Sequence, residues 1–206
     1  MGKHLIVYVD GFNLYHGIHD VFGRKKLWLD LVALSRSLRP NSDLLRVNYF
    51  TATVLDDPIG ASHQATYIKA LTSYNPGLVN VISGRYQRKS IRCYSCGNVR
   101  NSYEEKETDI NIAITLVADA LRNEDADRLI ISADSDLVPA VKAIKLHAPS
   151  VFVAAAFPPN RYSTQLKALM PASFQINKAK ISGAQLPDRV QNLETGNLLE
   201  RPVYWK

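Results

Sequence analysis

Three aspartates stand at or just after the ends of apolar runs that are typical of buried β-strands. Asp10 follows residues 5–9, and Asp134 and Asp136 come just after residues 129–131. Ligands of open parallel sheets bind beyond the carboxyl ends of the strands, so we expect these carboxylates at one sheet edge. Carboxylates gathered together bind hard divalent cations such as Mg²⁺ or Mn²⁺. The spacing therefore indicates a metal site able to activate water.

A fourth aspartate, Asp109, opens a segment with the apolar spacing of a helix. It shares one face with Ile112, Ala113 and Leu116, which follow at three, four and seven positions. A carboxylate on such a buried face is costly unless it is paired or bound to a cation. Asp119 lies about 15 Å further along the helix axis, so we expect it outside the site.

Each aspartate also has a plainer structural explanation. Asp10 with Gly11 is typical of a turn, and Asp134 and Asp136 are typical of helix N-caps. Asp109 in a first helical turn complements the helix dipole. We prefer the metal site because all four carboxylates are expected at one edge of the same sheet.

Strand-like and helix-like segments alternate along the chain, which predicts βαβ units and a parallel sheet covered on both faces. The expected strands are residues 5–9, 44–54, 78–82, 129–131, 151–157 and 173–176. The expected helices are residues 27–38, 63–74, 108–121, 138–146 and 163–169. We expect one domain over residues 1–180, a polar and basic insertion at about 84–106, and a C-terminal tail over 181–206.

Three short motifs carry a family likeness. They are VDGFNL at residues 9–14, EKETDINIA at residues 105–113 and ISADSDLVP at residues 131–139. In this order they resemble the NYN domain family, a LabA-like branch of the PIN-like nucleases, over roughly residues 4–178. The resemblance implies a PIN-like three-layer α/β/α sandwich with a central, mostly parallel sheet. It also implies metal-dependent hydrolysis of RNA, with an acidic set matching Asp10, Asp109, Asp134 and Asp136.

Four further residues of these motifs are expected to support the acidic set. Asn13 matches the asparagine of the first motif and could orient a carboxylate, contact a phosphate or simply form a turn. Ser132 and Ser135 flank the acidic pair and are expected to bond to the turn backbone. Asn111 lies close to Asp109 along the expected helix and is a candidate supporting residue.

One position departs from the family pattern. Many members carry a further aspartate six residues after the one that matches Asp109, and this chain has Thr115 there. The number of bound cations therefore stays open, and Thr115 favours the alternative of a non-catalytic RNA-binding module. A third hypothesis is a small-molecule enzyme that hydroxylates a pyridine ring, although no Gly-x-Gly-x-x-Gly cofactor motif is present.

The insertion contains the cysteines of the chain, Cys93 and Cys96. Cys-x-x-Cys-Gly resembles one knuckle of a zinc ribbon, but a closed Zn²⁺ site needs four ligands. Histidines or a second chain in a homodimer could complete it; free thiols are the preferred interpretation. The insertion is also rich in basic residues interleaved with tyrosines, which could contact phosphates and bases of RNA or form a solvated hairpin. The basic residues are Arg85, Arg88, Lys89, Arg92, Arg100 and Lys106.

The composition is that of a globular protein that favours polyanionic partners. The 206 residues are 46% hydrophobic and 21% charged, with a formal net charge of +6, which excludes a disordered or fibrous chain. No apolar run approaches the roughly 18 residues that span a bilayer, and the first residues do not resemble a signal peptide. We therefore expect a cytoplasmic protein with RNA as its partner.

Overall fold

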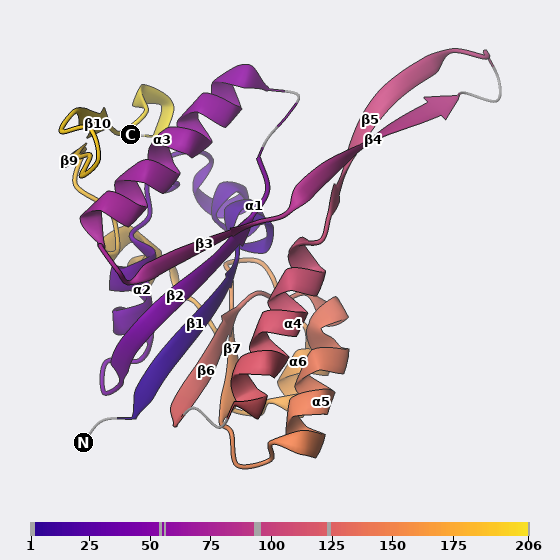
Figure 1. The fold of residues 1–206 in the computed structure, drawn as a ribbon, viewed down its shortest axis with the longest axis vertical. Helices are drawn as coiled ribbons and strands as arrows, with labels where there is room; N and C mark the ends of the chain where they lie inside the picture. Colours follow the sequence, from indigo (N-terminus) through magenta and orange to yellow (C-terminus); the bar gives the residue numbers. More distant parts are fainter. Residues whose placement is uncertain (1–2, 54, 56, 93–95, 123–124, 206) are drawn as a thin grey trace.

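A six-stranded, fully parallel sheet forms the middle of the molecule (Figure 1). The computed structural model describes residues 3–53, 55, 57–92, 96–122 and 125–205, and the side chains of all of these except residues 85–92 and 99–106. The strand order is β3-β2-β1-β6-β7-β8. The strands are β1 (His4–Asp10), β2 (Asp43–Thr51), β3 (Val79–Ser83), β6 (Ala126–Ile131), β7 (Val153–Phe157) and β8 (Phe174–Gln175).

The sheet changes its winding direction between β1 and β6. From β1 the chain proceeds outward through β2 to β3, and from β6 it proceeds outward on the other side through β7 to β8. The connections that leave the carboxyl ends of β1 and β6 therefore diverge. Such a switch point is where open α/β sheets form a crevice for ligands.

Helices cover both faces of the sheet and produce the three-layer sandwich that the sequence predicts. Leu5, Val7 and Val9 of β1 face one core, and Ile6 and Tyr8 face the other, all fully or almost fully buried. The first core includes side chains from α1 (Gly11–Phe22), α2 (Leu31–Leu38), α3 (Pro58–Tyr74) and α7 (Lys178–Gly183). The second includes side chains from α4 (Thr108–Leu121), α5 (Val138–His147) and α6 (Thr164–Leu169).

Several helix boundaries differ from those expected. Helix α1 was not expected at all, since two of its buried positions are Gly11 and Gly17, which carry no apolar signal. Helix α2 begins at Leu31 rather than at residue 27, because the Asp30 side chain accepts hydrogen bonds from the amides of Val32 and Ala33. Side-chain capping of this kind sets the first residue of a helix more strongly than apolar spacing does.

The segment expected as a tail over residues 181–206 is packed onto the domain over residues 181–205, the part of it that the structure describes. They contain β9 (Arg189–Gln191), β10 (Leu198–Glu200) and the short 3₁₀ helix η2 (Val203–Trp205). Ile181, Leu186 and Val190 are buried in the first core. In addition, the indole nitrogen of Trp28 donates a hydrogen bond of 2.7 Å to the carbonyl of Pro187. This segment therefore contributes to the core through side chains that show no regular spacing.

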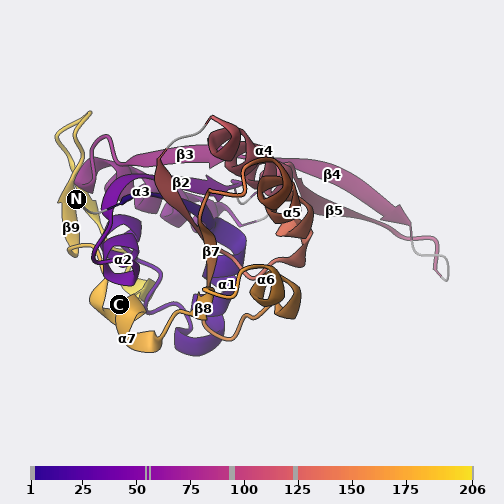
Figure 2. The same ribbon diagram turned by 90° about the horizontal axis from the view of Figure 1, so that it is seen from below.

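The expected insertion is an antiparallel hairpin of β4 (Arg85–Arg92) and β5 (Val99–Lys106). Figures 1 and 2 show it extending beyond the sandwich. The side chains of its basic residues lie outside the described part of the structure, as does all of Cys93, while Cys96 is an exposed free thiol. Among the described residues, no helix is long and apolar enough to cross a membrane.

Asp119, the α4 residue that the sequence analysis expects outside the site, belongs to a buried ion network. The Asp119 carboxylate, 3% exposed, accepts hydrogen bonds of 2.7 Å from the Tyr8 hydroxyl and 2.8 Å from Arg46. Burial, followed by the hydrogen bond to Asp119, raises the pKa of Tyr8. The neutral Tyr8 hydroxyl and the Arg46 guanidinium thus compensate a charge that would be costly if left alone.

We expect Asp119→Ala to lower the free energy of unfolding by about 3–5 kcal/mol, because it leaves the groups around it without their buried partner. Arg122 is the matched control: its side chain is 70% exposed and 3.6 Å from Asp119, so Arg122→Ala should change stability by about 1 kcal/mol or less. Chemical denaturation measures both. Equal losses for the two variants would contradict the role given to the buried network.

Candidate functional site

Three of the four expected carboxylates meet at the switch point of the sheet. Asp10 ends β1, Asp109 lies in the first turn of α4, and Asp134 follows β6. Each offers an oxygen, and these three oxygens all lie within 4.8 Å of one another. Asp10 is buried, Asp134 is half-buried and Asp109 is exposed, so the group is rooted in the fold and open on one side. We refer to these three residues as the acidic cluster.

A single serine hydroxyl connects two members of the acidic cluster. Ser132 is completely buried, and its Oγ donates a hydrogen bond of 2.8 Å to Oδ2 of Asp10. The same Oγ accepts a hydrogen bond of 3.0 Å from the amide of Asp134. The end of β1 and the turn after β6 are therefore fixed to each other by this side chain, in addition to the pairing of the two strands.

The first turn of α1 completes this framework. Oδ1 of Asp10 accepts a 2.9 Å hydrogen bond from the Asn13 amide, which makes Asp10 the N-cap of α1. Oδ1 of Asn13 in turn accepts a 3.0 Å hydrogen bond from the Ala133 amide. The Asn13 side chain therefore connects the start of α1 to the turn after β6, while its expected roles toward a carboxylate or a phosphate stay predictions.

Gly11 allows α1 to begin this close to the neighbouring strand. A Cβ at this position would lie 2.6 Å from the carbonyl oxygen of Phe50 and 2.9 Å from the Tyr49 ring. Backbone and a buried ring cannot give way to such a contact, so a side chain there would displace Asp10. The Asp-Gly pair is therefore a packed junction between β1 and α1 rather than a surface turn.

The remaining candidates, Ser135, Asp136 and Asn111, are close neighbours in sequence of two members of this cluster. The amide of Asp136 donates a 2.9 Å hydrogen bond to Oδ1 of Asp134, which caps the 3₁₀ helix η1 (Ser135–Leu137). The side chains of Asp136 and Ser135 are exposed, and Asp136 is not among the three grouped carboxylates. Asn111 is half-buried and lies one turn of α4 beyond the exposed Glu107. Its backbone amide donates a hydrogen bond of 2.7 Å to the Glu107 carbonyl. Roles for these residues stay predictions.

A hollow of about 170 Å³ lies over the acidic cluster, and three of its residues, Phe12, His16 and Arg161, were missed by the sequence analysis as site residues. Arg161 and His16 line it together with Phe12, Asn13 and the three aspartates. Arg161 follows β7 and forms an ion pair of 2.6 Å with Asp20. No sequence motif marks Arg161, since only the folded loop after β7 brings it here.

Close packing of α1 against that loop positions Arg161. A Cβ on Gly17 would lie 2.7 Å from Cβ of Pro158 and 2.8 Å from the Pro159 carbonyl oxygen. The glycine therefore permits an approach that any larger residue would prevent. The glycines at positions 11 and 17 are the one signal in the sequence that could have indicated this close packing of α1 against the loop after β7.

The donor chemistry of the acidic cluster fits a hard divalent cation. Its three members offer only carboxylate oxygens, the ligands that Mg²⁺ and Mn²⁺ prefer. Burial raises the pKa of the nearby Tyr49 to about 12, and the negative charge of Asp10 makes a smaller contribution in the same direction. Gathered carboxylates repel one another, and a bound cation would relieve that repulsion.

Fold and site together define an α/β/α domain of the PIN-like type with an acidic cluster at its switch point. The chain belongs to the NYN domain family, whose model matches residues 4–174. It is 26% identical over 174 residues to 6-hydroxy-3-succinoylpyridine 3-monooxygenase HspA of Pseudomonas putida, a match that covers 68% of this chain and 55% of the relative. The chain thus spans about half the length of that enzyme.

A solved structure shares the architecture. The crystal structure of a protein of unknown function from Vibrio parahaemolyticus superposes with a TM-score of 0.55 over 86% of this chain and 94% of the other. The sequence identity is 15%, so the likeness concerns the fold. It supports the α/β architecture that the alternating segments predict.

Mn²⁺ should stabilise the protein through the acidic cluster. At about 100 times its Kd, a ligand of the folded state adds about 2.7 kcal/mol, which corresponds to a rise in Tm of about 5–10 °C for a chain of this size. We expect Asp109→Asn to raise the Tm of the metal-free protein, because it relieves repulsion, and to lower the Mn²⁺-induced rise.

Asp43→Asn provides the control for this measurement, since Asp43 is exposed at the opposite, amino-terminal end of β2. It should leave the Mn²⁺-induced rise in Tm unchanged. Asp136→Asn tests whether the fourth aspartate contributes, and we expect a smaller loss than for Asp109→Asn. A rise in Tm that survives Asp109→Asn in full would contradict the site.

Proposed function

We propose that this protein is a metal-dependent ribonuclease that hydrolyses phosphodiester bonds of RNA with an acidic Mg²⁺ or Mn²⁺ site. The observation that carries the proposal is the meeting of Asp10, Asp109 and Asp134 at the switch point of an NYN domain. The proposed partner is RNA and the proposed location is the cytoplasm, where the net positive charge of the chain favours a polyanion.

The proposed ligands of the cation are the three clustered aspartates, with Asp136 as a further candidate. A divalent cation held there would lower the pKa of water and neutralise charge that develops on the phosphate. Asp10 cannot rotate freely, because Asn13 and Ser132 bond to its two oxygens. This preorganisation leaves the exposed Asp109 as the side of the cluster open to RNA.

Arg161 and His16 are proposed to hold the phosphate over the acidic cluster. Both line the hollow above it, and a guanidinium can bind two phosphate oxygens at once. The ion pair with Asp20 fixes the direction of the Arg161 side chain. A fixed cation beside the cluster would offset the repulsion between the carboxylates and the approaching RNA backbone.

The hairpin β4–β5 is proposed to guide the RNA toward this site. It leads directly into α4, whose first turn carries Asp109, and Glu107 at this junction adopts a left-handed φ of 80°. The chain therefore turns sharply between the hairpin and the acidic cluster. Basic residues on the hairpin would bind phosphates on either side of the cleaved bond; they are Arg85, Arg88, Lys89, Arg92, Arg100 and Lys106.

Cleavage of labelled single-stranded RNA with Mn²⁺ tests the proposal. We expect Asp10→Asn and Asp134→Asn each to lower the cleavage rate by about 100-fold or more, because each removes charge that acts in the transition state. Asp43→Asn should retain the wild-type rate, and the products should carry 5′-phosphate and 3′-hydroxyl ends. Cleavage unaffected by both cluster variants would show that another site, or a contaminating nuclease, is responsible.

Ser132→Ala should weaken the site without removing a proposed ligand. The serine positions Asp10 and Asp134, and loss of such a supporting group typically lowers metal affinity or activity by about 10–100-fold. We expect the Mn²⁺ concentration for half-maximal cleavage to rise by this factor. An unchanged Mn²⁺ dependence would mean that strand pairing alone holds the two aspartates.

Two other outcomes would favour the alternative functions. RNA binding without cleavage in any divalent ion would favour a non-catalytic RNA-binding module, for which Thr115 in place of a family aspartate is the supporting feature. The HspA likeness supports hydroxylation of a pyridine ring as a second candidate, although the match covers only 55% of that enzyme. That reaction would also need an electron donor and oxygen, so its assay has to supply both.

A further inference from the structure

A second, larger hollow of about 290 Å³ lies beside the acidic cluster and has aromatic walls. It is formed by α1, α3, the end of β2 and the C-terminal 3₁₀ helix. Phe12 and His16 line both this hollow and the one over the acidic cluster. We call it the aromatic pocket, and none of the functions considered above assigns it a ligand.

The aromatic pocket has one rigid wall of edge-to-face rings. The Trp205 ring lies 6.1 Å from that of Tyr67 and 5.9 Å from that of His63, at angles of 65° and 70°. The backbone of Trp205 is fixed by its amide, which donates to the Pro202 carbonyl, and by its carbonyl, which accepts from Arg201. The C-terminal segment thus supplies an aromatic surface held in place for contact.

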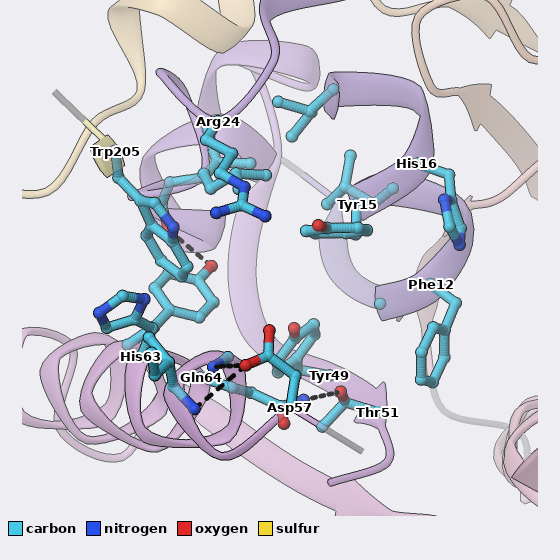
Figure 3. Close-up of a pocket in the computed structure, with 18 residues that line it drawn as sticks. Phe12, Tyr15, His16, Arg24, Tyr49, Thr51, Asp57, His63, Gln64 and Trp205 are labelled. Carbon is cyan, nitrogen blue, oxygen red and sulfur yellow. Dashed lines mark hydrogen bonds between the residues drawn. The ribbon is translucent and has the colours of Figure 1, made fainter. Parts of the chain in front are cut away.

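Tyr15 of α1 faces this wall from the other side of the pocket (Figure 3). Tyr15 is 40% exposed, and its ring stacks on that of His19 with the centroids 5.7 Å apart. Two opposed sets of rings favour a flat aromatic guest, since ring faces and edges attract each other beyond simple burial of apolar area. An aliphatic chain would gain only the apolar contact.

Polar groups in the walls add a requirement for hydrogen bonds. Oδ1 of Asp57 accepts from the amides of Ile59 and Gly60, and the carboxylate points into the pocket. The Gln64 amide nitrogen donates to Oγ1 of Thr51 and to the Ala52 carbonyl, which fixes this amide in the wall. Asp57 can accept from a ring N–H or amino group.

Arg24 adds a cationic group at the same pocket. Its guanidinium points toward the space between Trp205 and Tyr15 (Figure 3), where it can pair with an anionic substituent of the guest. We infer that the aromatic pocket binds a planar nitrogen heterocycle that carries an anionic group. Such a ring can be the base of a nucleotide or a free heteroaromatic acid.

Ligand-observed NMR on the intact chain tests this inference. The probes are uridine monophosphate, adenosine monophosphate and 6-hydroxypyridine-3-carboxylate, whose lactam form carries a ring N–H for Asp57. Each is measured in EDTA so that the acidic cluster holds no cation. Ribose 5-phosphate and cyclohexanecarboxylate serve as controls that have the anionic group without the aromatic ring. We expect saturation transfer to the ring protons of at least one probe and a shift of the Trp205 indole N–H signal.

Two variants of the same 3₁₀ helix separate contact from folding. Trp205→Ala should raise the Kd of the bound probe by about tenfold or more, the loss expected for one stacking contact. Tyr204→Ala is the matched control, because Tyr204 is the neighbouring residue, is 71% exposed and does not line the pocket. Circular dichroism checks that both variants keep the fold.

Some outcomes identify which kind of ring the pocket binds, and others test whether it binds an aromatic ring at all. Binding of the mononucleotides assigns the pocket to a nucleobase, and binding of 6-hydroxypyridine-3-carboxylate alone assigns it to a free heterocycle. Equal binding of cyclohexanecarboxylate, no binding of any probe, or an unchanged Kd in Trp205→Ala would overturn the inference. Because the measurement needs neither metal nor RNA cleavage, it can fail while the proposed hydrolysis holds, and the reverse.

Discussion

The site depends on bringing carboxylates closer together than their charges favour. Asp10, Asp109 and Asp134 offer oxygens within 4.8 Å of one another, and like charges at this distance oppose folding. The fold compensates with neutral donors, since the Ser132 hydroxyl and the Asn13 amide bond to the two oxygens of Asp10. These donors hold the carboxylate without neutralising it, which leaves the negative charge available to a cation.

The approach of Asp10 and Asp134 could be predicted from the sequence because it follows from topology. Carboxyl ends of neighbouring parallel strands meet at one edge whatever the details of packing, so two acidic strand ends suffice. The position of Asp119 could be predicted in the same way, from helical rise alone. Its partners Tyr8 and Arg46 could not be predicted, because they lie on β1 and β2, which are distant from α4 in the sequence.

Two features of the fold could not be predicted from the sequence: the close packing of α1 against its neighbours, and contacts between segments that are distant in the chain. Helix α1 packs through Gly11 and Gly17, which an apolar periodicity does not count. The need for glycine appears only in the fold, where a Cβ at these positions would collide with Phe50 and Pro158. Trp205 lies in a segment without periodicity, yet it contacts Tyr67 of α3, in the first half of the chain. Such contacts are properties of the folded surface, and no local pattern encodes them.

Helix α1 connects the two hollows and therefore determines how they can be used together. Asn13 faces the acidic cluster, Tyr15 faces the aromatic pocket, and Phe12 and His16 border both. A nucleotide whose base entered the aromatic pocket would have to place its phosphate past these two residues to reach the aspartates. A free heterocycle needs only the pocket. The same framework is thus compatible with the RNA hydrolysis proposed for this NYN domain and with the binding of a free heterocycle inferred for the aromatic pocket, and the residues of α1 are where the two uses would differ.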